Sequence, residues 1–299
     1  MIRETAQDEH LAHKQSPKSE RRILRPRVLV ALHETSAPHE SIAMGRLVSN
    51  MLRHALHGVF VSTGSTGPTN VHDVPEILRV PAHAFEGIVL EVEEGDPAAR
   101  LLEISGLHPT SFLIVGADPS TGDKLGVGEV ATRAIEESNA PVLVVRPGVT
   151  AKLERILVPL DGTPSTACAL EPVAELARAA GASLDVVLVG EAQHPPLSTE
   201  HGAMAPPQYV DQPHHEWPAF SGEFVERFLH TLGHCPSDVP MRFFLGAGDP
   251  GDEILRYAHI LRSDLAVLVW HGLASARHGA IFQSVVRRAN CPVLILRSQ

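Results

Sequence analysis

Short, continuous runs of Val, Leu and Ile recur along the chain, separated by stretches with apolar residues at three- and four-residue spacing. Continuous runs of this kind are typical of parallel strands that are buried on both faces. The intervening stretches predict helices, the clearest at 164–181, which ends in Gly181. Ten strands are predicted in this way, near residues 27–32, 58–63, 87–92, 111–116, 141–146, 154–160, 183–190, 240–246, 264–269 and 292–297.

The second part of the chain repeats the first in the same order. Four pairs of segments carry the repeat: RVLVAL (27–32) and RILVPL (155–160), EEGDPAARLLEIS (93–105) and GAGDPGDEILRYA (246–258), FLIVGA (112–117) and LAVLVW (265–270), NAPVLVVRP (139–147) and NCPVLILRS (290–298). The first pair is offset by 128 residues and the others by 151 to 153, so the second copy carries about 25 extra residues, mostly at 191–216.

This organisation predicts an α/β fold with two doubly wound, five-stranded parallel-sheet (Rossmann-like) domains in tandem. The domains are expected at 27–146 and 154–297, with 147–153 as the linker. Residues 1–26 have no helical or strand period, so they are expected to form a flexible N-terminal tail.

Charge and composition exclude several classes of function. The 299 residues include 25 Lys and Arg against 35 Asp and Glu, a formal net charge of −10, which argues against a nucleic-acid partner. No apolar run approaches 18 residues, which argues against a membrane span, and the N-terminus lacks the apolar core of a secretory signal. Three cysteines without a CxxC pair fit a reducing cytoplasm. Cys168 and Cys291 are expected to be core residues, and Cys235 to be exposed.

Gly-Asp-Pro occurs once in each copy, at 95–97 and 248–250. Asp is a favoured helix N-cap and Pro is favoured at the first helical position, so both triplets predict helix starts.

The ordered segments carry a family resemblance. The second copy reads RILVPLDGTPSTACALEPVAELARAAGASLDVVLV, then GDPGDEIL, SDLAVLVWHG and HGAIFQSVVRRANCPVLIL. This series resembles the universal stress protein family over nearly all of 154–297. The first copy resembles it over 27–146, through RVLVAL, EEGDPAARLLEIS, FLIVGAD and GVGEVATRAIEESNAPVLVV. The whole chain is therefore similar to a tandem member of that family.

The resemblance implies a nucleotide site, because many members of the family bind ATP. The family pattern is an acidic residue after strand one and G-x2-G-x9-G-S/T after strand four. Glycines let a backbone approach phosphates, and helix N-terminal amides attract anions. The resemblance implies ATP or another adenine nucleotide as ligand, with no metal beyond Mg bound to the nucleotide. The candidate residues in the second copy are Pro159, Asp161, Gly162, Thr163, His271, Gly272, Gly279 and Ala280.

The second copy departs from the family pattern after its fourth strand. Val269 replaces the first glycine, and Gly279-Ala280 replaces the Gly-Ser/Thr pair, which removes the hydroxyl. The loop is about three residues short. It still supplies three side chains that could meet a phosphate: Ser275, Arg277 and His278.

The first copy departs further. Gly116 and Gly128 are retained as candidates, but Pro119 replaces the second glycine and removes an amide donor. Glu129 follows Gly128 where the hydroxyl would stand, and a carboxylate there would satisfy helix N-terminal amides and repel a polyanion. The first site is therefore expected to be self-capped and closed to a triphosphate.

Three hypotheses of function follow. The first is a non-enzymatic stress-response protein that binds an adenine nucleotide in the second domain, with weak ATP hydrolysis at most. The alternative is a protein-interaction scaffold in which both pockets have degenerated. An adenylating or PP-loop-like enzyme is less favoured, because the sequence has no SGG-x-DS run, no Walker A motif and no G-x-S-x-G elbow.

Two further features concern partners. The 191–216 insertion contains four loosely spaced histidines among prolines, which is not a zinc signature and favours a mobile or partner-covering flap. In the family, the last strands of two domains commonly pair across a dimer axis. The resemblance therefore implies that VLVVR (142–146) and VLILR (293–297) pair within one chain to form a pseudo-dimer. A homodimer and the identity of protein partners stay open.

Overall fold

The computed structural model describes residues 25–63, 70–118, 123–161, 164–190, 238–270 and 276–297. Several predictions concern residues outside these ranges: nearly all of the N-terminal tail, the 191–216 insertion, and Cys235. Among the described residues, no helix has the length and apolar character needed to cross a membrane.

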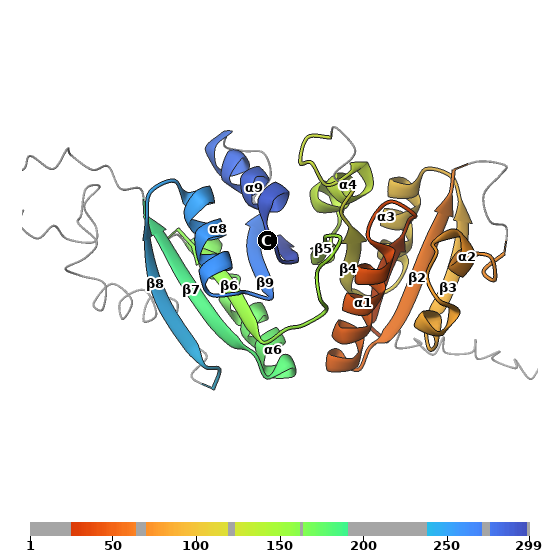
Figure 1. Ribbon diagram of the computed structural model, residues 1–299, viewed down its shortest axis with the longest axis horizontal. Helices are drawn as coiled ribbons and strands as arrows, with labels where there is room; N and C mark the ends of the chain where they lie inside the picture. Colours follow the sequence, from red (N-terminus) through yellow and green to blue (C-terminus); the bar gives the residue numbers. More distant parts are fainter. Residues whose placement is uncertain are drawn as a thin grey trace, which may run out of the picture.

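Ten strands form one continuous sheet, in the order β3-β2-β1-β4-β5-β10-β9-β6-β7-β8 (Figure 1). Their bounds are β1 (Arg27–Leu32), β2 (Ala55–Ser62), β3 (Val89–Glu94), β4 (Thr110–Gly116), β5 (Val142–Val145), β6 (Arg155–Leu160), β7 (Ser183–Gly190), β8 (Met241–Ala247), β9 (Leu265–Trp270) and β10 (Val293–Arg297). Each predicted strand is present, with ends displaced by no more than three residues. We call β1–β5 with their helices the first half and β6–β10 with theirs the second half.

The strands run parallel within each half, and the two halves join through an antiparallel pair. β5 and β10 lie side by side in the middle of the sheet, with Val293 opposite Val144 and Ile295 opposite Val142. This is the pairing that the sequence predicted for the two last strands. It leaves β3 and β8 at the outer ends of the sheet.

Helices cover both faces of the sheet, as a doubly wound fold requires (Figure 1). One face carries α1 (Pro38–Leu52), α2 (Val74–Ile77), η1 (Ala82–Phe85), α5 (Pro164–Ala167) and α6 (Leu170–Ala180). The other carries α3 (Pro97–Leu107), α4 (Glu129–Glu137), α8 (Pro250–Ile260) and α9 (Ala276–Arg288). Each face has one apolar cluster that runs through both halves, so the halves share their cores.

The helix predicted at 164–181 is divided into α5 and α6, which ends at the left-handed Gly181 (φ 66°). Cys168 lies in the break and is exposed, so its prediction as a core residue is wrong. Cys291 is buried as predicted, and burial raises the pKa of its thiol to about 12.

Both Gly-Asp-Pro triplets start helices in the predicted way. The Asp96 carboxylate accepts a hydrogen bond from the Ala99 amide (2.7 Å) at the start of α3, and Asp249 accepts one from the Asp252 amide (3.0 Å) at the start of α8. The same local device therefore begins the same helix in both halves.

Two arginines in equivalent positions of the repeat tie the halves together beside β5 and β10. Arg146 donates to the carbonyl oxygen of Val286 in α9 (2.5 Å), and Arg297, 151 residues later, donates to the carbonyl oxygen of Glu136 in α4. Each half thus satisfies a backbone acceptor of the other half.

Candidate functional site

In the second half, the structure describes Pro159 and Asp161 at the carboxyl end of β6. Pro159 is a half-buried residue of β6, opposite Val187 in β7. Asp161 directly follows β6 and is exposed, and its carboxylate accepts a hydrogen bond from the Thr166 hydroxyl (2.6 Å). The Thr166 oxygen in turn accepts from the Asp161 amide (3.3 Å), so Asp161 is held in the turn that leads into α5.

Gly279 and Ala280 lie inside α9, not at its start, because α9 begins at Ala276. The sequence aligns this pair with the family's Gly-Ser/Thr pair after strand four, and the structure places it within the helix. Glu129 at the start of α4 precedes β5 by 13 residues, whereas Ala276 precedes β10 by 17. The difference of four residues is about one helical turn. A methyl group at Gly279 would meet no atom within 4 Å, so the described residues do not require a glycine there.

The topology brings the candidate residues of the second half to one edge of the sheet. β6 and β9 are parallel neighbours, so their carboxyl ends meet, and α5 and α9 follow them along the chain. The other four candidates follow the same strand ends but lie outside the described residues: Gly162, Thr163, His271 and Gly272.

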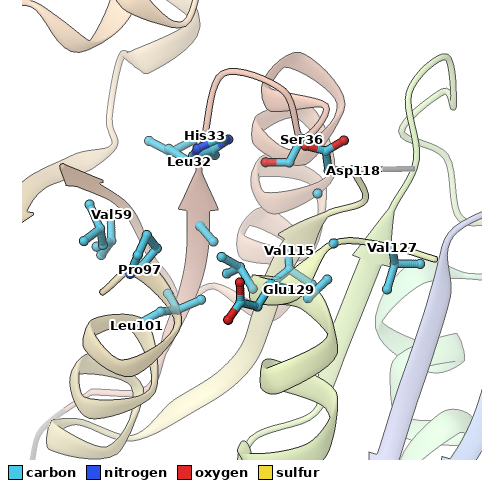
Figure 2. A pocket seen from close by; sticks show the side chains of 16 residues that line it. Leu32, His33, Ser36, Val59, Pro97, Leu101, Val115, Asp118, Val127 and Glu129 are labelled. Carbon is cyan, nitrogen blue, oxygen red and sulfur yellow. The ribbon is translucent and has the colours of Figure 1, made fainter. Parts of the chain in front are cut away.

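The first half has a cavity of about 150 Å³ at the corresponding edge (Figure 2). It lies between the carboxyl ends of β1, β2 and β4 and the N-terminal turns of α3 and α4. Its lining is Ala31, Leu32, His33, Ser36, Val59, Val61, Pro97, Leu101, Val115, Gly116, Asp118, Val127, Gly128, Glu129, Val130 and Ala131. The sequence predicted a closed first site and did not reveal this space.

Gly116 ends β4 against another stretch of the chain. A methyl group at Gly116 would lie 1.5 Å from the carbonyl oxygen of Ser36, in the turn after β1. No side chain fits at that distance, so the glycine is required by the approach of Ser36. This role needs no ligand.

The loop before α4 surrounds a carboxylate of the protein itself. Asp123 accepts hydrogen bonds from the amides of Leu125 (3.1 Å), Gly126 (3.1 Å) and Gly128 (2.9 Å), which we call the amide nest. It also accepts one from the Thr132 hydroxyl in α4 (2.6 Å). Amides that converge in this way form an anion site.

The amide nest is therefore occupied by Asp123. Burial on its own would raise the pKa of Asp123, but the hydrogen bonds from Thr132 and the loop amides outweigh it and lower that pKa below its ordinary value. The sequence assigned this role to Glu129, and that assignment is wrong. The Glu129 side chain is exposed and makes no hydrogen bond or ion pair to any residue that the structure describes. The signal in the sequence was Asp123 followed by Gly126 and Gly128.

A polar bridge joins two lining residues of the cavity, His33 and Asp118, through Thr35. The Thr35 hydroxyl, after β1, donates to the carboxylate of Asp118, after β4, and the His33 Nδ1 atom lies 3.2 Å from the same hydroxyl oxygen. Figure 2 shows His33, Ser36 and Asp118 at one side of the cavity, with Glu129 between Leu101 and Val115 in this view. The bridge fixes the two loops relative to each other.

No metal site is visible in the part of the chain that the structure describes. Within it, no three His, Cys, Asp or Glu side chains gather closely enough to hold an ion.

Comparison with known proteins fits this architecture. Residues 152–297 match the model of the universal stress protein family. The chain is similar to a universal stress protein from Archaeoglobus fulgidus (17% identity, 91% of this chain and 98% of that one, TM-score 0.63). It is also similar to a functionally unknown protein from Pseudomonas aeruginosa (16% identity, 92% and 93%, TM-score 0.64). At these identities the two structures establish a shared fold across both halves. Residues 152–297 are thus similar to the universal stress protein family, within a chain whose two halves together have the fold of the A. fulgidus protein.

Proposed function

We propose that this protein is a tandem universal stress protein, with domains at 27–146 and 154–297, that acts in the stress response without catalysis. Its second half binds an adenine nucleotide, ATP, ADP or AMP, near Asp161 and the first turn of α9. The first half does not bind a nucleotide.

The observation that carries the proposal is the contrast between the two strand ends. Asp161 is an exposed carboxylate at the carboxyl end of β6, an edge that α9 also reaches, and a carboxylate there can accept hydrogen bonds from a ribose or an adenine amino group. The N-terminal amides of α9 supply positive potential for a phosphate. In the first half, His33 stands at the position of Asp161, and Asp123 occupies the amide nest.

The absence of catalysis is proposed on chemical grounds. The sequence has neither a Walker A motif nor a G-x-S-x-G elbow. Of the two cysteines that the structure describes, Cys291 is buried with a raised pKa, which suppresses its thiolate.

Isothermal titration of the full chain with ATP, ADP and AMP tests the proposal. Asp161→Ala removes an acceptor from the proposed site, and losing a hydrogen bond to a charged group weakens binding by about tenfold or more. His33→Ala is the matched control, because His33 lies 128 residues earlier at the same point of the repeat. Its nucleotide affinity should equal that of the unmodified protein.

Two results would count against the proposal. If Asp161→Ala binds as tightly as the unmodified protein, the assigned site is wrong. If no nucleotide binds at millimolar concentration, the scaffold hypothesis replaces it. That alternative is favoured by one observation, the occupation of the first half's anion site by Asp123.

A further inference from the structure

The cavity of the first half is apolar inside. Its walls include Val59, Leu101 and Val115, each 1% exposed, together with Val127 and Ala131 from the start of α4. An apolar cavity of roughly 150 Å³ accommodates a molecule the size of benzene, whereas pockets for larger ligands start near 300 Å³. The space therefore suits one ring or a short branched chain, and it is too small for a nucleotide.

Four polar side chains line this cavity, and half of them are acidic: His33, Ser36, Asp118 and Glu129. Of the sixteen lining residues, all of them described, none is Lys or Arg, and two are carboxylic acids, Asp118 and Glu129. Asp123 adds a third carboxylate in the adjoining amide nest, where its lowered pKa keeps it ionised. The N-terminal turns of α3 and α4 each contribute about half a positive charge, which these carboxylates outweigh, so the balance repels an anionic ligand and attracts a cation.

The cations in and before α4 are paired with other carboxylates. Arg133 contacts Asp96 (2.8 Å) and Glu137 (3.1 Å), and Lys124 contacts Glu136 (3.4 Å). Neither of these two cations pairs with Glu129.

We propose that the cavity of the first half binds a compact apolar molecule that carries a cationic amine. The apolar part packs against Val59, Leu101 and Val115, and the ammonium group lies toward Glu129 and Asp118. Two copies of one fold would thus bind ligands of opposite charge, an anion in the second half and a cation in the first. The inference holds whether or not the second half binds a nucleotide.

Three probes with one common ring test the charge preference: benzylamine, benzyl alcohol and benzoate. Binding to the full chain is measured by saturation-transfer NMR and by competition among the probes. We expect benzylamine to bind at least about fivefold more tightly than benzyl alcohol, the factor for about 1 kcal/mol. We expect no detectable binding of benzoate.

Two substitutions and a control test whether benzylamine binds in this cavity. Ala31→Leu adds three carbon atoms to the lining and should abolish benzylamine binding, with circular dichroism to check that the fold is kept. Glu129→Gln changes an exposed side chain that makes no hydrogen bond or ion pair with a described residue. It should weaken benzylamine about two- to fivefold while benzyl alcohol is unchanged. Glu76→Gln is the matched control: it removes the same charge from exposed Glu76 in α2, on the other face of the sheet.

The proposal is overturned if benzoate binds as tightly as benzylamine, or if Ala31→Leu, still folded, binds benzylamine normally. It is also overturned if Glu129→Gln and Glu76→Gln weaken benzylamine equally. Repeating the titration with Asp161→Ala separates this site from the nucleotide proposal, because that variant should bind benzylamine normally even where nucleotide binding is lost.

Discussion

The two halves share their strand order and helix starts, and they differ where the fourth strand passes into the next helix. In the first half, β4 leads into the amide nest around Asp123, and α4 begins at Glu129. In the second half, α9 begins about one turn earlier relative to its last strand. The comparison shows that the two copies differ in the loop between the fourth strand and the next helix, while the strand order and the helix starts at Asp96 and Asp249 are shared. Five substitutions, in three tests, examine this difference between the halves.

The largest loss of stability is expected for a substitution at the end of β4. Gly116→Ala would force a methyl group to within 1.5 Å of the Ser36 carbonyl oxygen, so the backbone must move. We expect a loss of about 3 kcal/mol or more in the free energy of unfolding, the upper range for overpacking. Urea denaturation followed by circular dichroism measures it.

Val269 in β9 is the equivalent position in the second half. It has a branched side chain, whereas position 116 has no room for one. Val269→Ala removes two partly buried methyl groups and should cost only about 1 kcal/mol. Equal costs at the two positions would show that the approach of Ser36 does not set the first half apart.

The second effect is expected at the amide nest. Asp123→Asn replaces an ionised acceptor of the hydrogen bonds from Leu125, Gly126, Gly128 and Thr132. We expect a loss of about 2–3 kcal/mol in the free energy of unfolding at pH 7. Urea midpoints for both proteins, measured between pH 7 and pH 3, test this.

The pH dependence has a defined sign. Because folding lowers the pKa of Asp123, its contribution is complete well above the unfolded value of about 3.9. It is lost as the pH falls through the lower, folded pKa. The difference in the free energy of unfolding between Asp123→Asn and the unmodified protein should therefore become smaller below about pH 4. A gap that stays constant over this range would contradict the role given to the carboxylate.

The smallest loss of stability is expected at the helix N-caps that the two halves share. Asp96→Ala and Asp249→Ala each remove a helix N-cap and should each cost about 1 kcal/mol. Asp96 also pairs with Arg133, so its loss should be larger by a few tenths. Thermal unfolding monitored by circular dichroism compares the two. If only one of them destabilises the protein, the two helix starts are not equivalent.

The regular part of the fold could be predicted from the sequence because its causes are local and repeated. Buried parallel strands need continuous apolar runs, and these runs located all ten strands to within three residues. Asp followed by Pro identified the starts of α3 and α8. The repeat itself, with the family resemblance, predicted that β5 would pair with β10.

The site was less predictable because it depends on contacts between distant segments. The approach of Ser36 to Gly116 joins the turn after β1 to the end of β4, and no local pattern encodes it. The cavity arises from the relative positions of five elements. Asp123 was overlooked because an Asp before glycines is typical of any turn, whereas Glu129 had a conspicuous place at a helix start. The early start of α9 was missed because alignment of the two copies fixed its expected position.

The antiparallel pairing of β5 and β10 has a consequence for how the molecule holds together. The strands β5 and β6 are separated by only nine residues, 146–154, so the two surfaces that meet at this seam are tethered. Two separate chains would have to find each other by mass action, and their association would weaken on dilution. A short tether instead fixes a high effective concentration of one surface near the other. The pairing of β5 with β10, flanked by Arg146 and Arg297, therefore does not depend on protein concentration.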